Sequence, residues 1–178
     1  MSSFDCTQKL KRDIVNSIDE AKFKLQTLSH EIWGCPELAY QEKQSHDTLA
    51  LFFSNESGWI VESHFILETA FRATWGPFGG KEGDIVVNIG FLCEYDALPV
   101  IGHACGHNLI AEVGAAASIG LKGALEREPN CPVRVKVWLL WDPLRRTSKK
   151  NDFKHLNIRK HRHRQNYWDL DHHATKKS

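Results

Sequence analysis

The chain has 178 residues, enough for one domain of ordinary size or for an incomplete piece of a larger one. Apolar residues make up 42 % and charged residues 25 %, as in soluble globular proteins, and the formal net charge is +1. The charge is unevenly distributed, because residues 141–178 carry a net of +7 and residues 1–140 a net of −6. The sequence therefore predicts two chemically different pieces.

Two classes of protein are disfavoured. The start of the chain has no apolar stretch that could act as a secretory signal, and the most apolar run, residues 109–125, is interrupted by Glu112, Lys122 and glycines. A membrane protein is therefore not expected. Five cysteines without a signal peptide predict reduced thiols and a cytoplasmic location.

The first half of the chain predicts two helices and two strands. Apolar residues recur at spacings of four and three from Ile14 to Ile32, which is typical of an amphipathic helix that ends before Pro36. A second helix is expected over residues 42–57. Residues 59–67 and 70–75 are rich in aromatic and β-branched side chains, which favours strands.

The second half continues this alternation. Residues 84–93 form a nearly continuous apolar run, which predicts a central strand covered on both faces. Residues 109–125 predict a deeply buried helix, and residues 133–137 another strand. Alternating strands and helices favour a layered α/β domain. Residues 138–178 are polar and basic and show no period, so we expect an irregular, disordered tail.

The loop between the 84–93 strand and the 109–125 helix carries the chemistry. It gathers five potential metal-binding or proton-transfer side chains: Glu94, Asp96, His103, Cys105 and His107. Ligands of open α/β sheets bind beyond the carboxyl ends of strands. Cys105 and His107, with one glycine between them, could converge on zinc or a similar metal. A structural cysteine beside a hydrogen-bonded histidine would give the same spacing, so both interpretations stay open.

A family resemblance extends this interpretation. Glu94-Tyr-Asp-Ala-Leu-Pro99 followed by Gly102-His-Ala-Cys-Gly-His-Asn108 resembles the signature of the M20 metallopeptidases, in the aminoacylase-1-like branch. Cys35-Pro-Glu-Leu-Ala-Tyr-Gln-Glu42 is similar to another element of that family. The resemblance covers about residues 10–137. It implies that residues 1–137 are the incomplete amino-terminal half of a three-layer α/β zinc-peptidase-like catalytic domain.

The resemblance also implies a metal centre. In the family this centre holds two divalent ions, usually zinc, manganese or cobalt, and the motif assigns Cys105 and His107 as ligands. Asp96 would orient a ligand, and His103, Asn108 and Glu94 are further candidates for supporting contacts. Many relatives have Asp where this chain has Asn108.

The implied reaction is metal-dependent hydrolysis of amide bonds in small dipeptides or N-acyl amino acids. The family's general base lies in a Gly-Thr-Pro-Ala-Glu-Glu element after the next strand, where this chain has Arg145-Arg146 instead. Later ligands would fall beyond Ser178. We therefore expect a truncated, inactive form whose residues after about Val137 arise from alternative splicing or a shifted reading frame.

The sequence leaves two other functions open. A non-catalytic regulatory fragment, competing for partners of a full-length enzyme, is the main alternative. Nucleic-acid binding through the basic tail is disfavoured, since residues 141–178 contain no recognised binding motif. Expected partners are a small dipeptide or N-acyl amino acid substrate and, in full-length relatives, a second copy of the chain.

Overall fold

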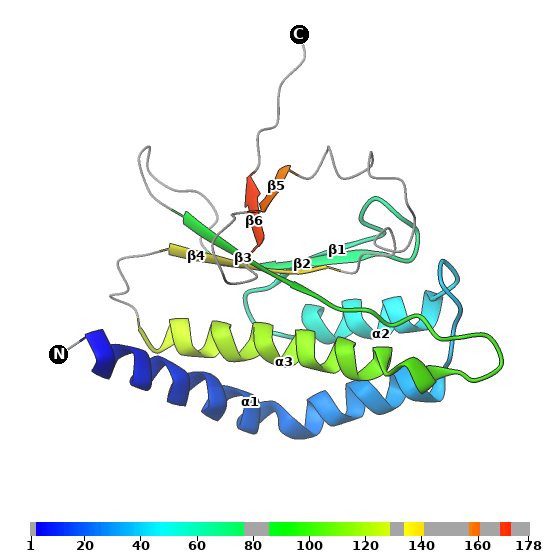
Figure 1. Ribbon diagram of the computed structural model, residues 1–178, viewed down its shortest axis with the longest axis horizontal. Helices are drawn as coiled ribbons and strands as arrows, with labels where there is room; N and C mark the ends of the chain where they lie inside the picture. The colour runs from blue at the N-terminus through cyan, green and yellow to red at the C-terminus, as the bar shows by residue number, and fades with distance from the viewer. Residues whose placement is uncertain (1–2, 77–85, 129–133, 141–156, 161–167, 172–178) are drawn as a thin grey trace, which may run out of the picture.

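The computed structural model describes residues 3–76, 86–128, 134–140, 157–160 and 168–171. The elements are α1 (Ser3–Gly34), α2 (Lys43–Ser54), β1 (Ile60–Ser63), β2 (Phe71–Trp75), β3 (Val86–Leu92), the short 3-10 helix η1 (His103–Cys105), α3 (His107–Glu126), β4 (Arg134–Leu140), β5 (Asn157–Lys160) and β6 (Trp168–Asp171). Figure 1 shows α1, α2 and α3 together on one face of a sheet, with β5 and β6 on the other side. The α/β class predicted from the sequence is confirmed.

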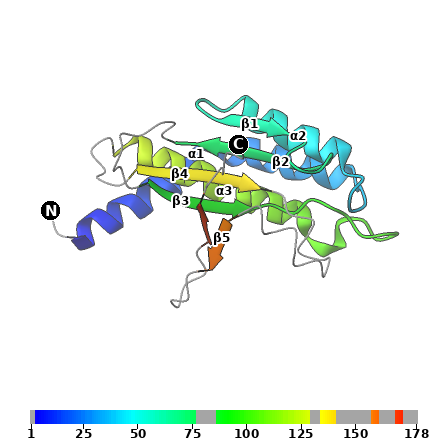
Figure 2. The ribbon, with the colours of Figure 1, turned by 90° about the horizontal axis from the view of Figure 1, so that it is seen from above.

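The main sheet has four strands in the order β1-β2-β4-β3 (Figure 2). β1 with β2 and β2 with β4 run antiparallel, and β3 with β4 runs parallel from the Val86–Arg134 pair to the Leu92–Leu140 pair. Among the described strands β3 therefore takes an edge, so the expectation that its apolar run marks a central strand is wrong for this part of the sheet.

The predicted strand over residues 59–67 is shorter in the structure. It ends at Ser63, because His64 and Ile66 take left-handed backbone conformations with φ of 56° and 67°. Such angles are incompatible with the extended geometry of a strand. Residues 64–69 instead form the loop from β1 to β2.

The predicted irregular tail contains some regular structure. β4 continues to Leu140, three residues past the predicted boundary at 137, and β5 pairs with β6 in an antiparallel two-stranded sheet. The remaining residues of the 138–178 segment lie outside the described ones.

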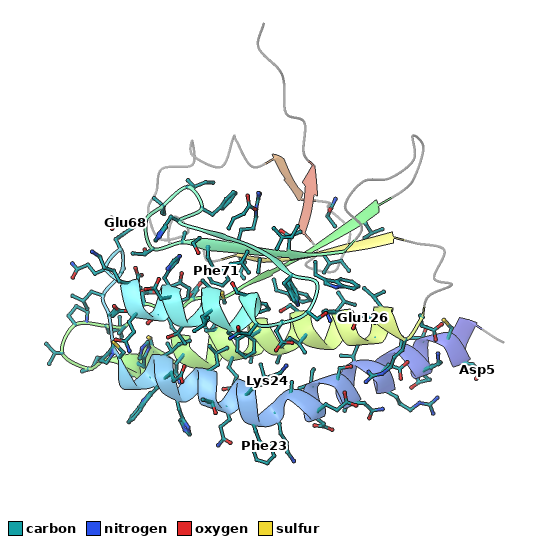
Figure 3. All side chains as sticks on the ribbon, turned by 180° about the vertical axis from the view of Figure 1, so that it is seen from behind. Asp5, Phe23, Lys24, Glu68, Phe71 and Glu126 are labelled. Carbon is teal, nitrogen blue, oxygen red and sulfur yellow. The ribbon has the colours of Figure 1, made fainter. Side chains whose placement is uncertain are left out.

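The hydrophobic core fills the space between the sheet and the helices, where Figure 3 places Phe71. Its largest fully buried side chains include Tyr95, Phe53, Phe71, Leu28, Ile32 and Leu49. α3 contributes one face, with Ala111 and Ala115 fully buried, while Leu109 and Val113 are 56 % and 67 % exposed. The expected deep burial of this helix therefore holds for one face only.

α1 and α3 pack closely along their length. A Cβ atom on Gly123 would lie 2.2 Å from Ser17 Oγ, and one on Gly120 would lie 2.9 Å from a side-chain carbon of Ile18. Arg127, just after α3, donates to Ser17 Oγ and to the Asp13 carbonyl. At these two positions of α3 only glycine leaves enough room for the helix contact.

Glu37 connects the start of α2 to the loop after β3. Its carboxylate accepts hydrogen bonds from the backbone N–H groups of Gln44 (3.0 Å) and Ser45 (2.8 Å). These donors have no partner within the first turn of a helix, so the contact caps α2. The Glu37 carbonyl also accepts the Ala97 N–H at 2.7 Å.

Glu42, directly before α2, has a fully buried carboxyl group. Burial raises its pKa above the ordinary value of 4.5, and the charge of Asp96 raises it further. Removing a carboxylate from water disfavours its charged form, so Glu42 holds its proton more tightly in the folded chain than in the unfolded one.

The first prediction concerns the contact between α1 and α3. Gly123→Ala should lower the free energy of unfolding by about 1–3 kcal/mol, because the added methyl group forces the helices apart, although alanine is the better helix former. Gly34→Ala is the control, since nothing lies within 4 Å of the added atom. Chemical denaturation measures both variants, and equal stabilities would contradict the packing described above.

The second prediction concerns Glu42 and pH. Because its folded pKa is raised, the stability that its proton provides is fully present below the unfolded pKa and is lost as pH rises through the folded pKa. Glu42→Gln, which keeps the shape without the charge, should therefore be more stable than the natural chain at pH 7. The difference should shrink as pH falls toward about 4. Exposed Glu31→Gln should show no such pH-dependent gain, and thermal unfolding across this pH range tests the pair.

Candidate metal centre

The candidate site lies where the chain leaves β3 and enters α3. Residues 93–96 continue past the strand without helix or strand structure, and a 3-10 turn then leads to Gly106. Gly106 has φ of 78°, a left-handed conformation that favours glycine, and α3 begins at the next residue, His107. The glycine of the Cys-Gly-His motif therefore makes the turn that places His107 at the start of the helix.

Glu94, Asp96 and His107 converge on one point. Each offers one ligand atom, and these atoms lie within 4.8 Å of one another. His107 Nδ1 is 2.7 Å from Asp96 Oδ1, and His107 Nε2 is 3.1 Å from Glu94 Oε2. His107 and Asp96 are buried, whereas the Glu94 side chain is 27 % exposed, so the group opens to solvent on the Glu94 side.

The two contacts restrict where the hydrogens of the His107 ring can lie. An ionised carboxylate can only accept, so the short contact with Asp96 places a hydrogen on Nδ1. At the 3.1 Å contact between Nε2 and the Glu94 oxygen, either a hydrogen on Nε2 is donated to the carboxylate or a bound cation lies between the two acceptors. Two ligands of a tetrahedral zinc ion, each about 2.0–2.2 Å from the metal, would be about 3.4 Å apart. This donor set therefore fits a divalent metal.

Cys105, assigned as a ligand from the motif, is not part of this group of donor atoms. Its thiol instead donates to the backbone carbonyl of Asp96, at a sulfur–oxygen distance of 3.6 Å. Cys105 and His107 lie on either side of the left-handed Gly106, where the chain changes direction. The role of Cys105 as a ligand therefore stays a prediction.

His103 is close enough to His107 and Asp96 for their charges to interact, and it is 8 % exposed. Burial lowers the pKa of its imidazole, although the backbone of Ile32 at the end of α1 acts in the opposite direction, and the neighbouring His107 lowers it again. A lowered pKa keeps His103 neutral near pH 7. It can therefore pack beside a divalent ion without adding a positive charge.

Asn108, a candidate for a supporting contact at the metal centre, makes a contact with α1. Its side-chain amide donates to Ser29 Oγ at 3.2 Å, and both residues are buried. The contact joins the first turn of α3 to α1. Asn108 thereby fixes the helix that carries His107, and its role near a metal stays a prediction.

Two residues that carry no assignment from the sequence adjoin the site. Tyr95, between the two carboxylates, is fully buried, and Glu42 is close enough to Asp96 for their charges to interact. The only signal in the sequence is that both belong to the motifs that carry the family resemblance. Nothing in the spacing of those motifs distinguishes them from ordinary core residues.

Among the residues that the structure describes, no helix combines the length and apolarity needed to cross a membrane.

Comparison with known proteins identifies relatives for most of the chain, although no family model matches it. The proteins named Xaa-Arg dipeptidase in Mus musculus and Homo sapiens are 52 % identical over 137 residues and 51 % identical over 140. Each alignment covers 75 % of this chain and 32 % of the relative. One of the subunits of p-aminobenzoyl-glutamate hydrolase from Escherichia coli (strain K12) is 28 % identical over 137 residues, covering 67 % of this chain and 27 % of that protein.

A solved structure supports the fold. An aminohydrolase from methicillin resistant Staphylococcus aureus superposes with a TM-score of 0.55 and 18 % identity, over 74 % of this chain and 34 % of that one. The chain thus spans about a third of the length of the curated relatives it matches. Over the three quarters of its length that these relatives cover, the chain belongs to the M20 family of peptidases and amidohydrolases.

Proposed function

We propose that this chain carries the first part of a divalent-metal centre that hydrolyses amide bonds of small peptides. One observation carries the proposal: Glu94, Asp96 and His107 bring their donor atoms within 4.8 Å at the carboxyl end of β3. The relatives named Xaa-Arg dipeptidase suggest dipeptides that end in arginine as the substrate class, and N-acyl amino acids are the alternative.

The contacts of each residue suggest its role in metal binding. Asp96 holds the His107 ring with Nε2 turned toward Glu94, where a divalent ion would bind, and such contacts commonly strengthen metal binding. Glu94 supplies an anionic oxygen on the solvent side, where a substrate would enter. Cys105 would complete the donors of this loop by rotating its thiol away from the Asp96 carbonyl. A bound zinc, manganese or cobalt ion would polarise the amide carbonyl and lower the pKa of a bound water to about 7.

The general base is the part that this sequence does not supply at the expected place. After β4 the chain reads Trp141-Asp-Pro-Leu-Arg-Arg146, where the family resemblance predicts an acidic pair. A guanidinium group cannot accept a proton from water and would repel a divalent cation. We therefore propose that the 178-residue chain alone binds metal weakly and does not turn over substrate.

The same proposal includes the cellular setting. Cys6, Cys35, Cys93 and Cys105 form no disulfide among the residues that the structure describes. Burial strongly raises the pKa of the Cys93 thiol, so this group is an unreactive member of the core. Thiols of this kind favour a reducing compartment such as the cytosol.

The third prediction is that His107 controls metal binding. Calorimetric titration of the chain with zinc should give an affinity that His107→Ala lowers at least about tenfold, because that variant removes both the Nε2 donor and the contact with Asp96. His30→Ala, in an exposed part of α1, is the matched control and should bind like the natural chain.

Cobalt can replace zinc to test Cys105 in the same experiment. We expect a sulfur-to-cobalt charge-transfer absorption that disappears in Cys105→Ser. If that absorption is absent in the natural chain, Cys105 is not a ligand. If His107→Ala binds zinc as well as the His30→Ala control does, the metal centre is wrongly placed.

The fourth prediction asks two separate questions: whether residues 1–137 can support catalysis when the rest of the enzyme is supplied, and whether the 178-residue chain is active alone. A chimera of residues 1–137 of this chain followed by the remaining sequence of human Xaa-Arg dipeptidase should hydrolyse an arginine-terminated dipeptide when loaded with metal. The natural chain alone should show no turnover, since loss of a general base typically costs about a hundred- to ten-thousand-fold in rate.

Two further variants of the chimera complete this test. His107→Ala should abolish its activity, and His30→Ala should retain it. A folded chimera without activity would contradict the proposed catalytic role of this segment. Turnover by the natural chain that His107→Ala removes would show that another residue serves as the base.

A further inference from the structure

Tyr95 stands between the two carboxylates of the metal group. Along an extended backbone, successive side chains point to opposite sides. Cys93 and Tyr95 accordingly enter the hydrophobic core and are fully buried, while Glu94 and Asp96 reach His107 on the other side. The rotation of this segment about its own axis therefore decides where both carboxylates point.

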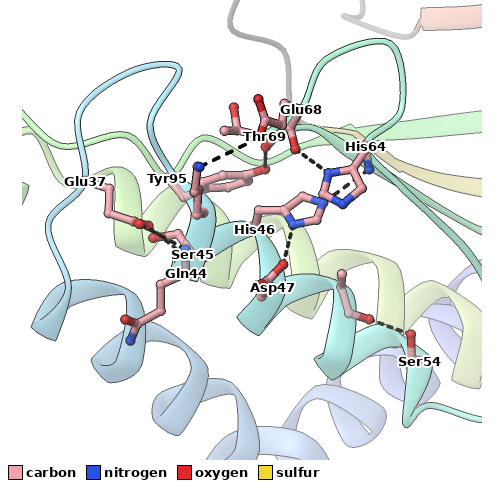
Figure 4. A network of polar contacts seen from close by, with 12 residues as sticks. Glu37, Gln44, Ser45, His46, Asp47, Ser54, His64, Glu68, Thr69 and Tyr95 are labelled. Carbon is pink, nitrogen blue, oxygen red and sulfur yellow. Dashed lines mark hydrogen bonds and ion pairs between the residues drawn. The ribbon is translucent and has the colours of Figure 1, made fainter.

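The Tyr95 side chain is fixed at both its ring and its hydroxyl. The ring stacks on Phe71 with the centroids 6.3 Å apart, and the hydroxyl donates to the Thr69 carbonyl at 2.6 Å (Figure 4). Burial raises the pKa of the phenol, so the group stays a neutral donor. A buried hydroxyl without an acceptor is costly, which makes Thr69 a strong anchor for the segment.

The loop that carries the Thr69 carbonyl is itself held in place. The His64 ring donates from Nδ1 to the Glu68 carbonyl, and it stacks on the buried His46 ring with the centroids 4.7 Å apart. The His64 N–H donates to His46 Nε2 at 3.3 Å, and His46 Nδ1 contacts Asp47 at 2.8 Å. Figure 4 shows these contacts leading from α2 through the 64–69 loop to Tyr95.

We infer that Tyr95 is a positioning residue for the metal centre, through which the 64–69 loop directs Glu94 and Asp96 toward His107. The inference rests on the proposed metal-binding function of that group. A phenylalanine would fill the same space in the core, but only the hydroxyl can join the segment to the loop. The ring therefore fills the core, whereas the hydroxyl fixes the orientation of the segment that carries Glu94 and Asp96.

Tyr95→Phe tests the inference, with Ser118→Ala as the matched control. Ser118 is a fully buried hydroxyl that donates to carbonyls within α3, so its loss removes a comparable hydrogen bond away from the site. Zinc affinity should fall about tenfold in Tyr95→Phe and stay within about twofold of the natural chain in Ser118→Ala. Both variants should keep the helical circular dichroism of the natural chain.

A second measurement does not depend on metal. Long-range proton–nitrogen NMR of the metal-free chain should report His107 with its hydrogen on Nδ1. In Tyr95→Phe we expect a mixture of the two tautomers, because Asp96 no longer holds one orientation, and Ser118→Ala should match the natural chain. A natural chain that shows this tautomer but binds no zinc would contradict the proposed metal function alone.

His64→Phe is a second variant for the case in which Tyr95→Phe fails to fold. It keeps an aromatic ring against His46 but removes the contact with the Glu68 carbonyl, at an exposed position. We expect a smaller loss of zinc affinity and a smaller change in the His107 tautomer. If folded Tyr95→Phe leaves both measurements as in the natural chain, Tyr95 fills the core and positions nothing; where Tyr95→Phe does not fold, the same result in His64→Phe contradicts the inference.

Discussion

The hydrogen bond between His107 and Asp96 joins the end of β3 to the start of α3, and the candidate site depends on it. It defines the proton on Nδ1 and the direction of Nε2, and it holds the first residue of a helix against the residues that leave a strand. His107, the first residue of α3, contacts both carboxylates, with Nδ1 against Asp96 and Nε2 against Glu94. A buried imidazole between two acidic groups is stable only where a cation or proton balances their charge.

The close packing of α1 and α3 provides the rigidity that this arrangement needs. Glycines 120 and 123 let the two helices approach near the end of α3, and Asn108 joins them near its beginning. α3 is thus held near both of its ends against one long helix, which fixes the helix that begins at His107. Because packed interiors deform little, such contacts can hold a side chain to within a fraction of an ångström.

Much of the fold could be predicted from the sequence, because apolar periodicity reflects the same burial that forms the core. The stripe from Ile14 to Ile32 predicted α1, and the metal loop was correctly expected between a strand and a helix. The edge position of β3 could not be predicted, since an apolar run records burial but not the number of neighbouring strands. The end of β1 depended on left-handed angles at His64 and Ile66, two residue types without a strong turn signal.

The site was only partly predictable, for a related reason. The motif singles out residues by their chemistry, so Glu94, Asp96 and His107 were all candidates before any geometry was known. The structure places Glu94 in the group of donor atoms through the alternation around Tyr95, whereas Cys105 lies on the other side of the left-handed Gly106 and its role as a ligand stays a prediction. Contacts such as that of Tyr95 with Thr69 join residues 26 positions apart, and no local pattern encodes them.

Glu37 couples the first turn of α2 to the metal loop. Its carboxylate satisfies the first turn of α2, and its own carbonyl accepts the N–H of the residue next to Asp96. If the helix frays, the cap is released and the backbone of Glu37 loses its fixed place, so the loop loses an anchor in the same step. A cation bound by that loop would, by reciprocity, protect the amide hydrogens of α2 from exchange with solvent, although it touches none of them.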